Sequence, residues 1–186
     1  MAQDSPDSLV VQTGQSPGDR AFSAQAVHLA RTAQINTLTL SQMADQKASI
    51  LIGATFVVFS LAVTRLIGSD IHASTLCLAA TAFLSSLFAV LAVIPSLGKP
   101  PSDPALRNPL FFGHFADEPA EEWAATMLAT FESDEALLRA MLTDIHQNGQ
   151  VLYRRKYRFL GYAYRIFLGG LAVTIAVYCA EAMALI

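Results

Sequence analysis

The basic run Tyr153–Arg158 is the part of the chain whose residue types and spacing come nearest to a binding chemistry. Its sequence is Tyr-Arg-Arg-Lys-Tyr-Arg. On a helix, Arg154 and Arg158 share a face, and Tyr153 lies over Tyr157. Two cations beside an aromatic ring could hold the phosphate and the base of a nucleotide. The same residue types are typical of a helix that enters a membrane and faces lipid headgroups, and that is the more general expectation for such a run.

A second polar cluster, Asp45 and Lys47, lies in the sequence Ala-Asp-Gln-Lys-Ala-Ser over residues 44–49, at the start of an apolar stretch. One interpretation is a polar helix end whose lysine extends toward the lipid headgroups. The other is that both side chains are buried against a second helix, as a polar layer that can switch. The residues by themselves leave both interpretations open.

No residue set indicates catalysis or a metal centre. The histidines and cysteines are scattered without the spacing of metal ligands: His28, His72, Cys77, His114, His146 and Cys179. The carboxylates show no paired arrangement on the helices near the membrane. The net charge of −3 argues against nucleic-acid binding. We therefore expect no enzyme activity, no metal, no cofactor and no nucleic-acid partner.

Three apolar stretches must position these clusters. The chain is 53% hydrophobic and only 15% charged, whereas soluble domains carry about 25% charged residues. A bilayer core about 30 Å thick needs about 20 helical residues. We predict transmembrane helices over 48–67, 74–95 and 163–186, and hence an all-α integral membrane protein with three spans and long cytoplasmic helical extensions. Glu181, near the end of the last span, is expected to reach the far interface.

The segments outside the spans have distinct compositions. Residues 1–19 are polar and are predicted to be a disordered tail. Residues 20–47 contain no proline or glycine and should form a cytoplasmic helix that continues into the first span. Residues 96–160 should form a cytoplasmic helical region. They open with a proline-rich stretch, 96–109, that cannot be regular helix; helices then begin near Pro119 and Ser133, and the second runs into the last span. Basic residues near the span ends place the N-terminus in the cytoplasm and the C-terminus outside.

The helix over 20–47 carries a coiled-coil seam. Its members follow alternating steps of four and three residues: Leu29, Ala33, Asn36, Leu40, Met43 and Lys47. Asn36 is the kind of polar seam residue that sets register and oligomeric state. The seam predicts either a homo-oligomer or packing on the helix over 137–152 of the same chain. Periodicity alone does not distinguish the two.

The aromatic run Asn-Pro-Leu-Phe-Phe-Gly-His-Phe over residues 108–115 lies outside the predicted spans. Together with the run at 44–49, and followed by Lys156-Tyr157, Leu160, Ala163-Tyr164 and Phe167, it resembles the transmembrane effectors of Pycsar antiphage systems. The resemblance covers residues 20–186. It implies a multi-pass protein of the bacterial inner membrane, encoded beside a pyrimidine cyclase. That cyclase makes a 3′,5′-cyclic pyrimidine nucleotide, cCMP or cUMP, during infection. The effector senses the nucleotide and impairs the membrane, which gives abortive infection.

On this resemblance, we expect the nucleotide to bind between the two long helices, under the aromatic run. The phosphate would lie near the charged residues and the base near the rings. The candidate ligand-binding residues are Asn108, Phe111, Phe112, His114, Phe115, Asp45, Lys47, Tyr153, Arg154 and Arg158. The alternative is a membrane scaffold or channel-like protein with no nucleotide ligand. A membrane conductance that responds to the ligand would separate the two.

Overall fold

The computed structural model describes residues 22–68, 72–95, 101, 103 and 107–184. The predicted N-terminal tail, 1–19, and most of the proline-rich stretch lie outside these residues. Every regular element in the described part is helical, and three helices are long and apolar enough to cross a membrane. The predicted all-α class with three spans is therefore confirmed.

Helix α1 spans Ala24–Gly68, 45 residues without interruption. It begins after Ser23, whose hydroxyl accepts a hydrogen bond from the backbone N–H of Gln25. The expected long rod, with the first apolar stretch continuous with the helix before it, is thus confirmed. Helix α2 spans Ala73–Val93 and ends two residues before Pro95, which cannot continue a helix.

The second rod consists of three helical segments in direct succession. They are α5 over Asp134–Val151, the π-helical segment η2 over Leu152–Tyr157, and α6 over Arg158–Ala184. The Ser133 hydroxyl caps α5 by accepting a hydrogen bond from the N–H of Ala136, as expected from the sequence. The short helix α3, Phe112–Phe115, and α4, Ala120–Thr130, precede this rod. The π-helical turn was not predicted, because no sequence period marks it.

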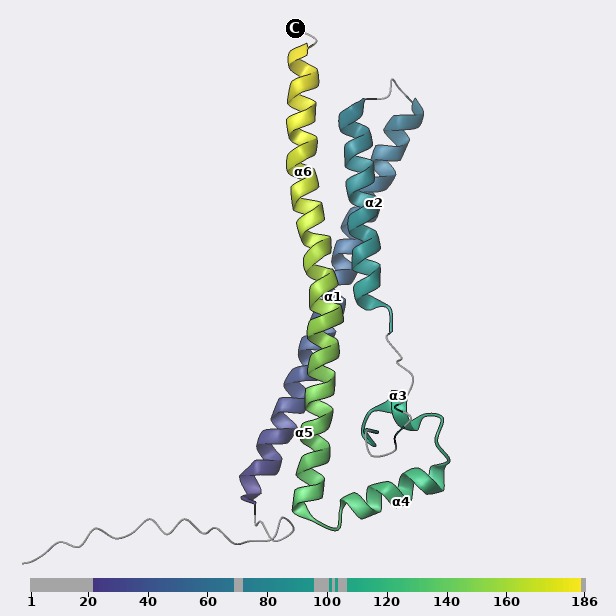
Figure 1. The fold of residues 1–186 in the computed structure, drawn as a ribbon. Helices are drawn as coiled ribbons and strands as arrows, with labels where there is room; N and C mark the ends of the chain where they lie inside the picture. The colour runs from purple at the N-terminus through teal and green to yellow at the C-terminus, as the bar shows by residue number, and fades with distance from the viewer. Residues whose placement is uncertain (1–21, 69–71, 96–100, 102, 104–106, 185–186) are drawn as a thin grey trace, which may run out of the picture.

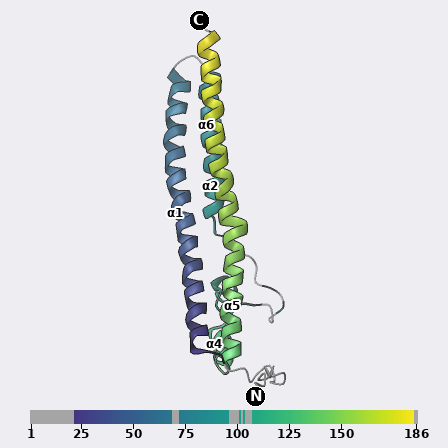
Figure 2. The same ribbon diagram turned by 90° about the vertical axis from the view of Figure 1, so that its left-hand side faces the viewer.

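The two rods and α2 lie side by side (Figures 1 and 2). Helix α1 contacts α5 at one end of the molecule and α2 at the other, while α2 packs on α6. The contact surfaces are rich in small residues: Ala48, Ala82, Ala89 and Ala163 are fully buried. Small side chains let helix backbones approach closely, which is how helices pack where apolar burial from water contributes little.

Two polar contacts and one glycine fix α2 against α6. The Ser85 hydroxyl donates to the carbonyl of Ala163 at 2.9 Å, and a Cβ at Gly170 would overlap the side chain of Thr81. Near the C-terminal end, the hydroxyl and backbone N–H of Ser74 donate to the Glu181 carboxylate at 2.6 and 3.3 Å. The Glu181 carboxylate therefore accepts hydrogen bonds at the N-terminus of α2, where the first backbone N–H groups lack partners within the helix. The sequence did not suggest this contact.

The face of α1 that packs on the second rod and α2 is not the predicted seam but the one beside it. Ala30, Ala44 and Ala48 are buried, whereas Leu29, Leu40 and Met43 are exposed. Asn36 and Lys47 are exposed as well. The helices contact each other as in the intramolecular alternative, yet through a different set of residues, because small side chains allow a closer approach than leucine and methionine.

Candidate functional site

A cavity of about 510 Å³ lies between the two rods, at the end of α2 that leads into the aromatic run. Its size falls in the range of small-molecule sites in proteins. The lining residues come from α1, the end of α2, the aromatic run, α5 and η2: Leu38, Ser41, Asp45, Ala92, Val93, Ile94, Pro95, Leu110, Phe111, Phe112, Asp144, Asn148, Val151, Arg155 and Lys156. Both rods and the loop between them therefore contribute to one enclosure.

One wall of the cavity carries an ion pair between the rods. The Lys156 ammonium group lies 2.6 and 2.7 Å from the two carboxylate oxygens of Asp45 and 2.8 Å from the hydroxyl of Ser41. The Lys156 side chain is 21% exposed and that of Asp45 is 38% exposed. Arg155 lines the same cavity. Both cations belong to η2, so a π-helical turn presents them there, and such turns occur frequently at functional sites.

The opposite end of the cavity is organised by a buried carboxylate. Asp144 accepts hydrogen bonds from three side-chain amides: Gln34 of α1 at 3.0 Å, Asn108 at 3.1 Å and Asn148 of α5 at 2.9 Å. Its relative exposure is 8%. A buried carboxylate must be compensated by hydrogen bonds, and here the donors come from both rods and from the aromatic run. Asp144 thus ties the three parts together.

The aromatic run is held by Asn108, which is completely buried. Besides its bond to Asp144, its side-chain amide donates to Gln147 at 3.1 Å, and its side-chain oxygen accepts from the N–H of Leu110 at 2.9 Å. Its backbone N–H donates to Nδ1 of His114 at 2.9 Å. These bonds leave few conformations for the intervening residues, so the run presents Phe111 and Phe112 to the cavity in a defined geometry.

The structure brings together some of the predicted site residues and not others. Asp45, Phe111 and Phe112 line the cavity. Asn108 and His114 stand behind it as supports, and the ring of Phe111 meets that of His114 edge-on at 5.0 Å. The ring of Phe115 instead packs on Trp123, with centroids 5.3 Å apart.

The remaining predicted residues are exposed and do not line the cavity: Lys47, Tyr153, Arg154 and Arg158. The guanidinium of Arg158 lies over the ring of its neighbour Phe159, at 5.6 Å from the centroid. Asp45 and Lys47 were the two residues considered for a polar layer at the membrane boundary. Of these, Asp45 faces the second rod and Lys47 does not. A layer between the rods exists, but its cation is Lys156.

Sequence reasoning missed Ser41, Asp144, Asn148, Arg155 and Lys156 as cavity residues. Asp144 lies seven residues after Leu137, and so on the apolar face of α5, a signal that could have found it. Lys156 lies inside the basic run Tyr153–Arg158, but α-helical spacing favoured Arg154 and Arg158 as the binding residues. In the part of the chain that the structure describes, no group of three His, Cys, Asp or Glu side chains could hold a metal ion.

Comparison with known families gives one match. The family model described as the Pycsar effector protein domain matches residues 28–181, which is most of the chain. No curated protein and no solved structure matches the chain. The matched range contains the whole cavity, α1 from His28 onward, α2, and the second rod up to Glu181, three residues before α6 ends at Ala184.

Proposed function

Since the chain belongs to the Pycsar effector family, we propose that it is a bacterial antiviral-defence effector that binds cCMP or cUMP in the cavity between its rods. The nucleotide comes from a partner pyrimidine cyclase, and its binding impairs the inner membrane and causes abortive infection. The protein is multi-pass, with the N-terminus and the cavity on the cytoplasmic side. Its partners are the lipid bilayer and the nucleotide, and it carries out no chemical conversion.

The observation that carries this proposal is the combination of cations and rings on the lining of one cavity. A cyclic phosphate bears a single negative charge, which suits the ammonium of Lys156 and the guanidinium of Arg155. Phe112 lines the cavity, is 56% exposed overall and offers a ring for the base; one such stack contributes about 1–3 kcal/mol. Asp144 and Asn148 provide polar groups for the base edge.

The ion pair explains how binding would alter the protein. A phosphate at Lys156 competes with the Asp45 carboxylate, because both are anions that need the same ammonium group. When the nucleotide takes over Lys156, α1 loses its link to η2. A ligand changes a conformation only by binding one state better than another, and here the state without the Asp45–Lys156 bond is the one favoured.

The rods then carry this change to the spans without a flexible joint. Helix α1 continues unbroken into the first apolar stretch, and η2 continues directly into α6. A π-helical turn contains one residue more than an α-helical turn accommodates, so its conversion would rotate α6 relative to α5. Rotation or displacement of α6 against α1 and α2 would open the helix packing that seals the bilayer.

The experiment uses the full chain reconstituted in liposomes loaded with a potassium gradient. Addition of cCMP or cUMP on the side of the cavity should collapse the membrane potential, and calorimetry on the same protein in nanodiscs should detect binding of one or both nucleotides. The helical content, measured by circular dichroism, serves as the control for folding. A helical, reconstituted protein that binds neither nucleotide would refute the proposal and favour the scaffold or channel-like alternative.

A further inference from the structure

Helix α1 carries two parallel seams, and its own chain uses only one of them. The first consists of Ala30, Gln34, Thr37, Ser41, Ala44 and Ala48, and it faces the second rod. The second is the seam predicted from the sequence, displaced by one residue along the chain. Both follow alternating steps of four and three. A helix with two such seams is suited to pack on two neighbours at once.

The large apolar side chains of the second seam are exposed in the region ahead of the first span, where the seam ends with the exposed Lys47. Leu29 is 72% exposed, and Leu40 and Met43 are each 44% exposed. Apolar side chains gathered on one exposed face mark an interaction surface more often than chance placement. Asn36, in the middle of this face, is exposed too.

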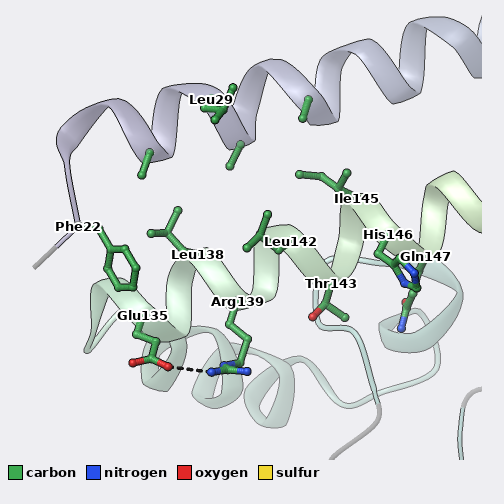
Figure 3. A pocket seen from close by; sticks show the side chains of 13 residues that line it. Phe22, Leu29, Glu135, Leu138, Arg139, Leu142, Thr143, Ile145, His146 and Gln147 are labelled. Carbon is green, nitrogen blue, oxygen red and sulfur yellow. Dashed lines mark hydrogen bonds and ion pairs between the residues drawn. The ribbon is translucent and has the colours of Figure 1, made fainter. Parts of the chain in front are cut away.

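The seam also borders a groove, which Figure 3 shows from close by. The groove has a volume of about 830 Å³, with Leu29 and Ala33 of α1 on one side and Leu138 and Leu142 of α5 on the other. Leu142 is 58% exposed. The exposed seam and the groove therefore form one apolar surface that extends over both rods.

We infer that this surface binds a second copy of the chain, with the two α1 helices parallel and in register. The membrane supplies the alignment: copies inserted in the same orientation hold their first spans at the same depth, so seam residues of equal number lie opposite one another. Confinement to one bilayer also raises the effective concentration of the copies.

Asn36 distinguishes a second copy from an unrelated partner. In a parallel, in-register pair the two Asn36 amides face each other across the axis, where each can donate a hydrogen bond to the other. An antiparallel helix, or a partner with an unbroken apolar seam, would leave the amide opposite an apolar side chain. The pattern thus fits self-association through α1.

The test uses single cysteines in a background in which Cys77 and Cys179 are replaced by alanine. Leu29→Cys and Leu40→Cys place a thiol on the seam, while Ile35→Cys places one on a face of α1 away from both seams. The variants are purified, reconstituted at low protein density without nucleotide, and oxidised. We expect the two seam variants to give a band near twice 20.0 kDa, severalfold stronger than that of Ile35→Cys.

A second measurement distinguishes a specific dimer from crosslinks that form when two copies collide at random in the membrane. In the Leu40→Cys protein, replacement of Leu29 by aspartate should abolish the dimer band, whereas replacement of Ile35 by aspartate should leave it. Equal crosslinking on both faces, or no dimer from either seam variant, would overturn the inference. So would a seam crosslink that appears in cells at another mass and is absent from purified liposomes, since the occupant would then be a different protein. Because no nucleotide is added, these outcomes do not depend on the proposed ligand.

Discussion

The carboxylate of Asp45 on α1 and the ammonium group of Lys156 in η2 lie 2.6 Å apart and join the two rods at the wall of the cavity. The two residues are separated by 111 positions in the chain. The first belongs to a helix that becomes the first span, and the second lies just before the helix that becomes the last. An anion that displaces Asp45 from Lys156 would therefore act on both of these helices at once.

Replacement of Lys156 by glutamine should weaken nucleotide binding by about 10- to 150-fold, because a charge-assisted hydrogen bond contributes about 1.5–3 kcal/mol. Lys47→Gln is the matched control, since Lys47 is an exposed lysine of α1 outside the cavity. Calorimetry in nanodiscs measures both. Equal losses of affinity in Lys156→Gln and Lys47→Gln would show that the total positive charge of the protein, and not the cavity, governs nucleotide binding.

Asp45→Asn should act in the opposite direction. It removes the anion that competes for Lys156, and a partly exposed ion pair stabilises by up to about 1 kcal/mol, so affinity should rise by up to about fivefold. The same variant should depolarise liposomes at a lower nucleotide concentration than the unmodified protein. Weaker binding in Asp45→Asn would mean that Asp45 assists the ligand instead of competing with it.

Replacement of Phe112 by alanine should reduce affinity by about 5- to 150-fold, the equivalent of one base stack of about 1–3 kcal/mol. Phe131→Ala is the control, because Phe131 is 58% exposed, close to the 56% of Phe112, and lies outside the cavity lining. Membrane insertion should be unchanged in both. If Phe112→Ala retains full affinity, the base lies elsewhere.

Asn108→Ala should loosen the aromatic run, because it removes a donor to the buried Asp144 carboxylate. The loss of a bond to a buried carboxylate costs about 1–3 kcal/mol. Hydrogen exchange of the amides over 108–116 should accelerate, while exchange in α2 should stay the same. Gln42→Ala, at an exposed position of α1, should leave both regions unaffected. Unchanged exchange over 108–116 would show that Asn108 does not fasten the run.

Gly170→Ala should lower the thermal stability of the protein in detergent, by about 1–3 kcal/mol of overpacking. The added methyl group would overlap Thr81 of α2. Gly169 has open space where a Cβ would be placed, so Gly169→Ala is the matched control and should retain the melting temperature. Equal changes in the melting temperatures of Gly170→Ala and Gly169→Ala would contradict the close packing of α2 on α6.

Much of the architecture follows from local features of the chain. Helix α1 is continuous because no proline interrupts residues 24–68, and α5 begins directly after Ser133 because the hydroxyl of that residue caps the helix. The three spans follow from length and hydropathy, since a bilayer demands an uninterrupted apolar helix whatever its neighbours. The motifs at 44–49 and 108–115 indicated the family, which the family match to residues 28–181 confirms.

Tertiary structure alone decided which faces meet. The more apolar seam of α1 is the stronger signal in the sequence, yet the chain packs through the adjacent face, where Ala44 and Ala48 permit close contact. Likewise, α-helical spacing favoured Arg154 and Arg158, whereas the π-helical turn directs Lys156 to Asp45. The periodicity of one helix determines which residues share a face. Which face is buried depends on the shape of the neighbouring helices, and that information is distributed over residues far apart in the chain.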